Sequence, residues 1–386
     1  MKKINHLLIM IIISICVIIS GCSHSINKYG SYSFSTDNKN AKRIANKIPR
    51  YQRMANSSWG ILDFERTISV NEKHEQIPEI RQRLIIMGDL KSSFKNKSNK
   101  YDVTTQRAIY QFQWRHGLQQ SGIIDKETIS ALNIPPYEKL NILISSMKKW
   151  SQYSDKNNNE YILVNIPEYK LHLMQGGKEQ ISMKVITGTK KNPTPELDSN
   201  ITTIVFNPTW NVPESIITKE IAGFMQKDSQ YLTKNKISVY SDWEHNSKRI
   251  DPIDIDWTNI ENNGTDFRFT QSSGRHNVLG KVKFLFKNSH DVYLHDTQNK
   301  SLFNTTTRTY SHGCVRVQDP LLLAQYLLVN NRKGELNAFE ETSENKKTKY
   351  VNLSRKIPIH ITYITAWVDE YGIIHFRNNI YNEKLY

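Results

Sequence analysis

Hydrophobic and polar positions divide this chain into stretches of unlike character. Residues 7–19 are almost continuously apolar, and residues 23–70 are polar with little periodicity. Apolar positions recur at helical spacing over residues 72–150, whereas the chain from residue 161 onward contains short segments that alternate as strands do. A chain of 386 residues is long enough for two folded domains. The pattern therefore predicts an α+β protein with more than one domain.

Short alternating segments dominate the second half of the chain. Proline and glycine separate them, as at Pro167 and Gly188. Such a density of short strands is typical of a β-rich sandwich or barrel. Residues 215–266 interrupt the alternation with a helical, irregular insertion. The predicted strands are residues 161–166, 170–174, 183–187, 202–206, 281–286 and 291–294.

A small helical module precedes the strands. Apolar residues there lie three or four positions apart, for example Ile80 and Leu84, as they do on the buried face of a helix. The polar stretch before this module lacks such periodicity, which is typical of a linker. The predicted segments are a linker over residues 22–70 with a short helix near 40–54, a helical domain over 71–134, a connecting helix over 135–160, and a catalytic domain over 161–386.

The N-terminus has the layout of a secretory signal. Lys2 and Lys3 give a positive start, the apolar run 7–19 follows, and small residues end it before Cys22. The run is too short for a membrane span, which needs about 20 apolar residues. We therefore predict a signal over residues 1–21 that exports the body of the protein. A stop-transfer anchor is the alternative, and it too would leave the body outside the cytosol.

The positions of the cysteines single out one thiol. Of three cysteines, Cys16 lies in the predicted signal, Cys22 follows it directly, and Cys314 stands alone in the body of the chain. Catalysis explains an unpaired thiol in an exported protein better than packing does. His295 lies upstream as a candidate base, with 15 residues between it and Ser311.

Two segments around this thiol carry a family signature. Residues 310–317 read Tyr-Ser-His-Gly-Cys-Val-Arg-Val, and residues 293–297 read Tyr-Leu-His-Asp-Thr. Together they resemble the L,D-transpeptidases of the YkuD fold, in which a histidine precedes Ser/Thr-His-Gly-Cys at a similar spacing. The resemblance implies that Cys314 is the nucleophile and His295 the general base and acid. It also implies that the backbone carbonyl of Asp296 orients His295, with the Asp296 carboxylate as the alternative.

The loop before the cysteine supplies the other groups predicted for catalysis. Gly313 lets the backbone present amides, including that of Cys314, to the negative oxygen of a tetrahedral intermediate. His312 is a predicted supporting residue, with a structural role in the loop as the alternative. Because a free thiol has a pKa of about 8.5, we expect pairing with a histidine to provide the thiolate.

Further segments resemble the YcbB branch of the L,D-transpeptidases. They include residues 206–213, 277–280 and 357–363. The resemblance implies that the insertion at 215–266 forms a cap over the substrate site, in which the aromatic residues pack the cap. Two departures are Gln298, where proline usually follows His-Asp-Thr, and a chain that is much shorter than the long members of the branch.

Six residues are predicted to bind the substrate. The Arg316 guanidinium could hold a stem-peptide carboxylate with two parallel hydrogen bonds. An ion pair between Arg316 and an acid such as Asp319 is equally open, Ser311 could cap the turn, and Tyr310 could be a packing group. The six are Arg316, Ser311, Tyr310, Asn207, Trp210 and Asn277.

The helical module resembles peptidoglycan-binding domain 1. Residues 108–113, Gly117, Gly122 and residues 131–132 carry the resemblance. It implies three helices joined by glycine-containing turns. A basic insert at residues 91–100 is absent from the usual pattern. Glycan binding is one implied role, and docking or scaffolding is the alternative.

The end of the predicted signal also matches a known motif. Residues 19–22 resemble the bacterial lipobox, which implies lipidation of Cys22. In a Gram-negative cell, Ser23 after that cysteine implies an outer-membrane lipoprotein that faces the periplasm. Several buried acyl chains would anchor the protein firmly to the membrane.

The net charge narrows the choice of partners. It is +15 for the whole chain and +13 without residues 1–21. An exported protein seldom meets nucleic acid, so we predict no nucleic-acid partner. Attraction to an anionic polymer such as peptidoglycan, or to anionic lipid, fits the compartment better. The base composition of the genome is an equally good explanation for the many lysines.

The family resemblance implies a specific reaction. The enzyme would form 3-3 cross-links in peptidoglycan through a cysteine thioester on a tetrapeptide stem, with a second stem amine as acceptor. No cofactor and no metal is predicted, and a glycan polymerase or a carboxypeptidase could be a partner. The alternatives are an L,D-carboxypeptidase or hydrolase with the same Cys-His site, and a non-catalytic lipoprotein that tethers the membrane to peptidoglycan.

Overall fold

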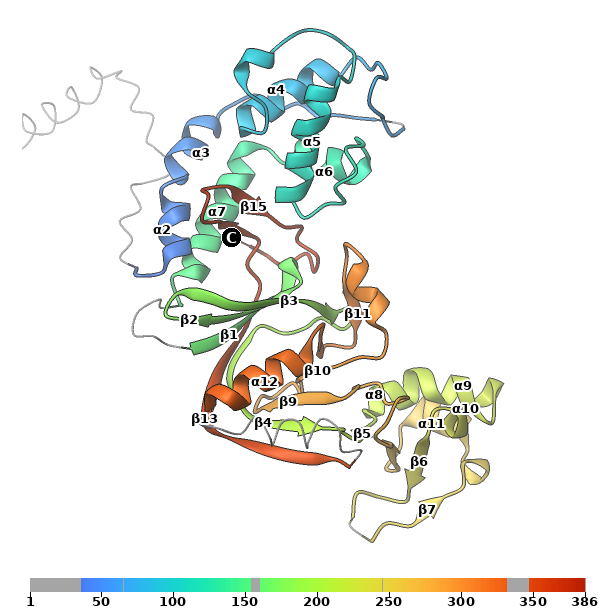
Figure 1. The fold of residues 1–386 in the computed structure, drawn as a ribbon. Helices are drawn as coiled ribbons and strands as arrows, with labels where there is room; N and C mark the ends of the chain where they lie inside the picture. Colours follow the sequence, from blue (N-terminus) through green and yellow to red (C-terminus); the bar gives the residue numbers. More distant parts are fainter. Residues whose placement is uncertain (1–35, 65, 154–159, 245, 332–346, 386) are drawn as a thin grey trace, which may run out of the picture. The chain divides into compact units, whose positions relative to one another are not determined.

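The computed structural model describes residues 36–64, 66–153, 160–244, 246–331 and 347–385 (Figure 1). The predicted signal over residues 1–21 and the predicted lipidation site Cys22 lie outside the described residues. Across the ranges that are described, the structure has no helix with the length and hydrophobicity of a membrane span.

Helices form the N-terminal part of the described chain (Figure 1). Asp102 and Asp125 each accept a hydrogen bond from the backbone three residues ahead, which caps the helices that follow them. Gly88 ends its helix in the left-handed conformation, at φ 88°. The helices are α2 (Lys39–Ala45), α3 (Ile48–Met54), α4 (Ile77–Met87), the 3-10 helix η1 (Ser92–Phe94), α5 (Val103–Arg115), α6 (Lys126–Asn133) and α7 (Pro136–Trp150).

Helices α4, α5 and α6 share one hydrophobic core. Ile80 and Leu84 of α4, Phe112 of α5 and Leu132 of α6 are all buried in it. These residues recur at the helical spacing seen in the sequence, because one face of each helix points inward. The predicted three-helix module is therefore confirmed.

A buried arginine holds the basic insert of this module. Arg81 is 1% exposed, and its guanidinium donates to the backbone carbonyls of Asn96, Ser98 and Lys100. It also forms an ion pair with Asp102. Because each donor finds an acceptor, the charge can be buried and the insert is fixed to the module.

Helices α2 and α3 belong to the folded body. Their buried residues Ala41, Ile44, Ile48 and Tyr51 face inward, and both helices contact α7. The helix expected near residues 40–54 is therefore present as two short helices, but their packing differs from the linker predicted over residues 22–70. The apolar positions are too few for periodicity to reveal them, and their partners lie about a hundred residues farther along the chain.

The strands close into a barrel. They follow the order β11-β3-β12-β10-β9-β4-β13-β1-β2, and β2 also pairs with β3, the strand next to β11, which closes the sheet. A β-rich architecture of the sandwich or barrel type was predicted, and this is confirmed. The strands are β1 (Glu160–Asn165), β2 (Lys170–Gln175), β3 (Lys178–Gly188), β4 (Leu197–Phe206), β9 (Val282–Phe286), β10 (Leu294–His295), β11 (Thr309–Ser311), β12 (Val315–Val317) and β13 (Lys349–Thr362).

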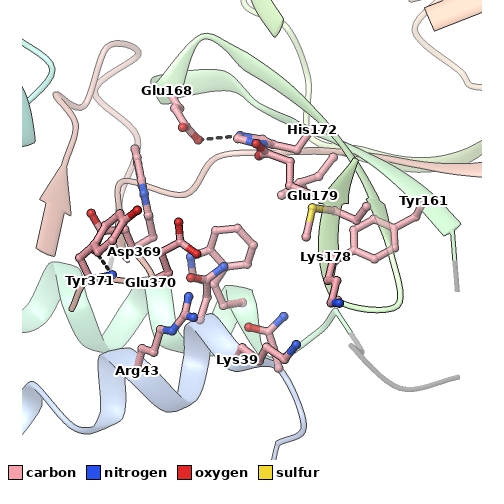
Figure 2. Close-up of a pocket in the computed structure, with 17 residues that line it drawn as sticks. Lys39, Arg43, Tyr161, Glu168, His172, Lys178, Glu179, Asp369, Glu370 and Tyr371 are labelled. Carbon is pink, nitrogen blue, oxygen red and sulfur yellow. Dashed lines mark hydrogen bonds and ion pairs between the residues drawn. The ribbon is translucent and has the colours of Figure 1, made fainter. Parts of the chain in front are cut away.

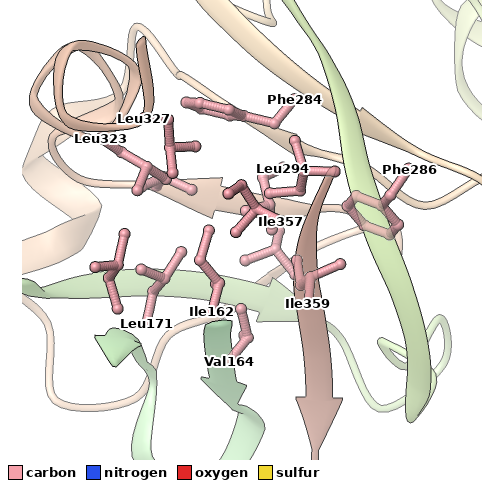
Figure 3. Packing of buried hydrophobic residues seen from close by; sticks show 14 of the residues in the cluster. Ile162, Val164, Leu171, Phe284, Phe286, Leu294, Leu323, Leu327, Ile357 and Ile359 are labelled. Carbon is pink, nitrogen blue, oxygen red and sulfur yellow. The ribbon is translucent and has the colours of Figure 1, made fainter. Parts of the chain in front are cut away.

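The barrel core is aliphatic and aromatic, as Figure 3 shows. Phe284, Leu294 and Ile359 are buried in it, each on a different strand. Helix α12 (Pro320–Asn331) adds Leu323 and Leu327 to the same core. The alternating residues between these buried positions therefore lie on the opposite face of the sheet.

The strand predicted at residues 291–294 is wrong over most of its length. Only Leu294 and His295 form β10, and Asp291 adopts a left-handed φ of 52°. The side chain of Asn288 instead closes a turn, accepting from the backbone N–H groups of His290 and Val292. Side-chain bonds of this kind compete with strand pairing.

The insertion predicted at 215–266 lies within a small subdomain of helices and strands over residues 210–271, which has its own core. The helices were expected, but the four-stranded sheet β5-β8-β6-β7 was not. Trp257 and Tyr231 pack on its core, but Trp243 is 63% exposed, so the expectation that it packs the cap is wrong. The elements are β5 (Trp210–Asn211), α8 (Glu214–Ile216), the π-helix η3 (Ile217–Ile221), α9 (Ala222–Lys227), α10 (Tyr231–Lys234), β6 (Ile237–Tyr240), β7 (Arg249–Ile250), η4 (Pro252–Asp254), α11 (Trp257–Asn263) and β8 (Arg268–Gln271).

The C-terminal hairpin of β14 (Ala366–Val368) and β15 (Ile374–Phe376) packs against the helices. The indole N–H of Trp150, at the end of α7, donates to the carbonyl of Ala366 at 3.2 Å. This bond holds the connecting helix against the C-terminal segment, in keeping with the packing role expected for Trp150.

A buried ion pair lies beside a pocket of about 600 Å³ near these elements. Figure 2 shows Glu168, His172 and Glu179 together, with Arg43 and Glu370 among the other residues that line the pocket. Burial alone would raise the pKa of Glu168, but His172, 3.0 Å away, lowers it to about 2. Burial would lower the pKa of His172, but Glu168 and Glu179 raise it to about 9.

We expect His172→Gln to lower the free energy of unfolding by about 3 kcal/mol near pH 5.5, because buried Glu168 loses its nearest cation and keeps only the Asn165 amide at 3.2 Å and Lys170 Nζ at 3.8 Å. The contribution of His172 is complete below its ordinary pKa of 6.5 and is lost as the pH rises through about 9. That of Glu168 is complete above 4.5 and is lost as the pH falls through about 2. Urea unfolding at several pH values measures both.

The matched control is His360→Gln. His360 pairs with Asp198, whose side chain is 78% exposed, so the loss should stay below about 1 kcal/mol. Equal losses in the two variants, or a His172→Gln effect that grows from pH 6 to pH 10, would contradict the assignment.

Candidate active site

Sheet register brings the two predicted catalytic residues to one face. In the parallel pairing of β10 with β12, Leu294 is registered with Val315, and His295 with Arg316. Leu294 and Val315 are buried in the core, so His295 and Arg316 lie on the opposite face. Cys314 immediately precedes Val315 and therefore shares that face. Residues far apart in sequence thus become neighbours on adjacent strands.

His295 is held as a neutral base. Its Nδ1–H donates to the backbone carbonyl of Asp296 at 2.5 Å, which leaves Nε2 free to accept a proton. Burial, and then the nearby Arg316 and Lys283 charges, lower the pKa of His295 to about 3. The carbonyl of Asp296, not its carboxylate, contacts the ring.

The Asp296 carboxylate fixes the turn that presents this carbonyl. It accepts from the backbone N–H of Lys281 at 2.8 Å and from that of Thr297 at 2.7 Å, and it pairs with Lys300 at 2.6 Å. Gly280 packs directly against it. A Cβ on Gly280 would lie 2.3 Å from Asp296 Oδ2, so only glycine fits at this position.

Cys314 is a neutral thiol in the resting site. Burial raises its pKa, and this outweighs the lowering by Tyr293 and Arg316. The raised pKa of the thiol and the low pKa of His295 favour a neutral pair at rest, with His295 expected to take the thiol proton during the reaction. The proton must therefore move as the sulfur attacks.

The tight turn before Cys314 leaves one backbone donor open. The Ser311 hydroxyl donates to the Cys314 carbonyl at 2.5 Å and accepts from the Gly313 N–H at 3.2 Å. Gly313 has a φ of 114°, which side chains rarely tolerate. Among the described residues, the backbone N–H of Cys314 has no acceptor. It is therefore the amide available to an oxyanion, whereas that of Gly313 is occupied.

Thr194 supports this turn from below, and the sequence analysis did not predict this role. The Thr194 hydroxyl donates to the Gly313 carbonyl at 2.7 Å and accepts from the Gly188 N–H at 2.8 Å. Gly188 leaves no room for a side chain, because a Cβ would lie 2.1 Å from the Asn192 carbonyl oxygen. The glycine and proline turns at residues 188–195 were the only available signal.

His312 points to the cap subdomain. Its Nε2 lies 2.5 Å from Glu220 Oε1 on η3, and both side chains are exposed. Tyr310 is 40% exposed at the same loop. His312 therefore links the loop to the cap subdomain. The group that orients the ring of His295 is the carbonyl of Asp296 instead.

The remaining predicted substrate residues differ in accessibility. Asn277 is fully buried, and its amide group bonds the carbonyls of Pro208 and Ser272, so in this structure it braces a loop and is not open to a substrate. Asn207 adopts a left-handed φ of 45° and accepts from Thr348 through its carbonyl. Trp210 is half-buried and lies near the Tyr293 side chain, which also neighbours Cys314.

Two cations flank the site. In the described part of the chain, no carboxylate is paired with Arg316, so the alternative pairing with Asp319 is not seen there. Lys283 of β9 is registered with His295 on its other side, and its pKa is lowered by burial. Lys283 was not predicted, although the alternation Val282-Lys283-Phe284 places it on the face opposite the core. In the described ranges no group of three or more metal-ligating side chains occurs.

Two family models match this chain. Residues 159–336 match the one described as "L,D-transpeptidase catalytic domain" (YkuD), and residues 73–132 match the one described as "Putative peptidoglycan binding domain". A curated relative from Haemophilus influenzae, named "Putative L,D-transpeptidase", is 34% identical over 219 residues. The match covers 55% of this chain and 42% of the relative, so the chain spans less than half of the relative's length.

Solved structures of L,D-transpeptidases are also similar at low identity. One from Xylanimonas cellulosilytica is 11% identical, with a TM-score of 0.24, over 78% of this chain and 100% of that chain. An LD transpeptidase solved in complex with imipenem is 13% identical, with a TM-score of 0.26, over 53% and 60%.

Proposed function

We propose that this chain, which carries a YkuD-type L,D-transpeptidase catalytic domain and a peptidoglycan-binding domain 1 module, forms 3-3 cross-links in peptidoglycan through a cysteine thioester. One observation carries the proposal. His295 and Cys314 lie on one face of adjacent strands, and the Nδ1–H of His295 is committed to Asp296, so Nε2 is free for the thiol proton.

In the acylation step the thiol of Cys314 gives its proton to His295 Nε2 as the sulfur attacks. A C–S bond forms at the carbonyl of the third stem residue, and the negative oxygen accepts from the Cys314 N–H. The C–N bond to D-alanine then breaks, and His295 returns the proton to the departing amine. Cys314 and His295 are both neutral at the start, and D-alanine leaves with a neutral amine, so the step leaves no net charge on the enzyme.

The second step resolves the thioester. The amine of another stem attacks the acyl carbon, passes a proton to His295, and expels the Cys314 thiolate, which is then reprotonated. Water in place of the amine would give an L,D-carboxypeptidase, and a D-amino acid would give exchange. The cap subdomain over residues 215–266, joined to the loop by His312, would limit access of water to the thioester.

Location and domain roles follow from the same assignment. An enzyme that acts on peptidoglycan works outside the cytosol. The finer assignment is a lipoprotein with a signal over residues 1–21, lipidated at Cys22 and facing the periplasm from the outer membrane. In this scheme residues 71–134 hold the wall or dock a partner, while residues 161–386 catalyse.

The test is a product analysis with purified disaccharide-tetrapeptide. We expect a 3-3 linked dimer and free D-alanine, identified by mass spectrometry. Tripeptide without dimer would replace transpeptidation by hydrolysis at the same site. Unchanged substrate, together with binding of the full chain to sacculi, would instead support a non-catalytic tether.

A further inference from the structure

A second pocket, of about 470 Å³, lies where the helical module meets the barrel. The module lines it with residues 116–120, the barrel with residues 167–170 and 304–308, and the C-terminal segment with Arg377. Its volume lies within the range of small-molecule sites, about 300–1,000 Å³. The described residues that line it do not include Cys314 or His295, so this pocket is separate from the catalytic site.

Close contacts fix the two sides of this pocket to each other. The Arg377 guanidinium donates to the carbonyl of Arg115 at 3.3 Å, and the His116 ring stacks on Phe376 with 5.4 Å between the ring centroids. A Cβ on Gly117 would lie 2.7 Å from Cδ of Arg377, so the chain passes too close for a side chain there. The shape of the pocket is therefore set by the fold.

The pocket carries an excess of positive charge. Its lysines and arginines outnumber its acids, and Glu168 is the acid among the lining residues. His172 lies 3.0 Å from Glu168 and is held protonated beside it, which balances that charge. The four cations that line the pocket are Lys170, Lys184, Arg308 and Arg377.

The two arginines keep hydrogen-bond donors for a ligand. Arg308 is 9% exposed and donates to the backbone carbonyls of Val185, Thr305 and Tyr169. Arg377 donates to two backbone carbonyls. A guanidinium carries five N–H donors, so both groups have donors to spare, and within the described residues neither forms an ion pair. Because a buried cation without an opposite charge is costly, an anion bound here would be stabilised.

An exposed aromatic face of α5 leads into this pocket. Tyr110 is 45% exposed and Trp114 is 39% exposed, and a spacing of four residues places them on one face of the helix. Trp114 lines the pocket, and His375 packs edge-on against its ring at 4.8 Å between centroids. Exposed aromatic side chains next to a cleft are typical of binding surfaces.

We propose that this pocket and the aromatic face of α5 together hold a peptidoglycan strand at a stem that is not reacting. The sugars lie on Tyr110 and Trp114, and the stem carboxylates enter the pocket and accept from Arg308 and Arg377. The inference rests on the proposed function and adds how the wall polymer is held away from Cys314.

The division of the site matches the chemistry of this polymer. In peptidoglycan the sugars are uncharged, whereas the peptide stems carry free carboxylates. Trp114 belongs to residues 73–132, which match the peptidoglycan-binding family model, but all four cations lie outside that range. The helical module alone therefore has an incomplete site, and the barrel and the C-terminal segment complete it.

The experiment measures calorimetric binding of disaccharide-tripeptide to the purified full chain. This ligand lacks the residue that leaves during acylation, so it is not turned over. We expect its affinity to exceed that of the same compound with carboxamides in place of carboxylates by about tenfold, the range of a charge-assisted hydrogen bond. Lys184→Gln should remove most of this preference, and Lys184→Arg should restore part of it.

Two control variants match the tests in chemistry and lie outside the pocket. Lys178→Gln removes an exposed charge from the same strand, β3, and should keep the preference for the acid. Trp114→Ala should weaken binding of both compounds, whereas Tyr137→Ala, which removes an exposed aromatic ring from α7, should not. Any binding at the catalytic site is common to all variants, so the differences between them report this pocket. Unfolding midpoints show that lost binding is not lost structure.

Two results would overturn the inference. One is a folded Lys184→Gln variant that keeps the full preference for the acid, which would leave wall binding to the module alone. The other is a stem-free disaccharide that binds as tightly as disaccharide-tripeptide, which would mean that carboxylates are not recognised. The proposed function fails separately: if the wild type forms no cross-links but its binding still depends on Lys184, the pocket stands as a wall-binding site without the transpeptidase.

Discussion

Cys314→Ala should abolish acyl transfer, with a loss of at least about a thousandfold in the rate of D-alanine release, because the variant lacks the thiol that forms the acyl bond. His295 remains in place in the variant but has no thiol to activate. The fold should be unaffected, since Cys314 lies on the face opposite the barrel core and its carbonyl and N–H are retained. Intact-mass measurement after exposure to a carbapenem reports the nucleophile directly.

The wild-type chain should gain one carbapenem adduct that maps to Cys314, and the alanine variant should gain none. The matched control is Cys22→Ser, which removes another cysteine of the chain and should keep the adduct. An adduct on Cys314→Ala, or full cross-linking by that variant, would show that the site has been misassigned. Unfolding midpoints of the variants confirm that lost acylation is not lost structure.

Gly280→Ala should have the next largest effect, because it acts on both stability and activity. The new Cβ would lie 2.3 Å from Oδ2 and 2.6 Å from Cβ of Asp296, and Gly280 has a left-handed φ of 61°. We expect a loss of at least about 3 kcal/mol in the free energy of unfolding, from strain and overlap together. As Asp296 moves, its carbonyl releases the ring of His295, so the activity per folded molecule should fall as well.

Gly372→Ala is the matched control, because it introduces backbone strain without steric overlap. Gly372 also has a left-handed φ, 78°, but the nearest atom to a new Cβ is Lys47 Nζ at 3.5 Å, an ordinary contact. It should cost about 1–2 kcal/mol and leave the activity per folded molecule unchanged. Urea unfolding followed by activity assays on folded protein compares the two. Equal unfolding energies would mean that Gly280 does not support Asp296.

Sequence reasoning succeeded where the information is local. Helical spacing predicted the three-helix module, and the alternation of apolar and polar residues predicted most barrel strands. The sequence motifs around His295 and Cys314 indicated the catalytic domain. It failed at residues 291–294, where the side chain of Asn288 forms a turn that alternation does not reveal. The helix expected near residues 40–54 is present as α2 and α3, but their packing on α7 was not predicted, because α7 lies far along the chain.

The sequence by itself determined the two modules and the β-rich class and predicted the nucleophile and its base, because short motifs and periodicity are properties of neighbouring residues. Only the tertiary structure decided which face the site occupies, that Lys283 joins Arg316 there, and that Asn277 is buried in a loop. It also decided that thiol and imidazole are both neutral at rest. Those properties depend on strand register and burial, which arise from contacts between residues that are distant in the chain.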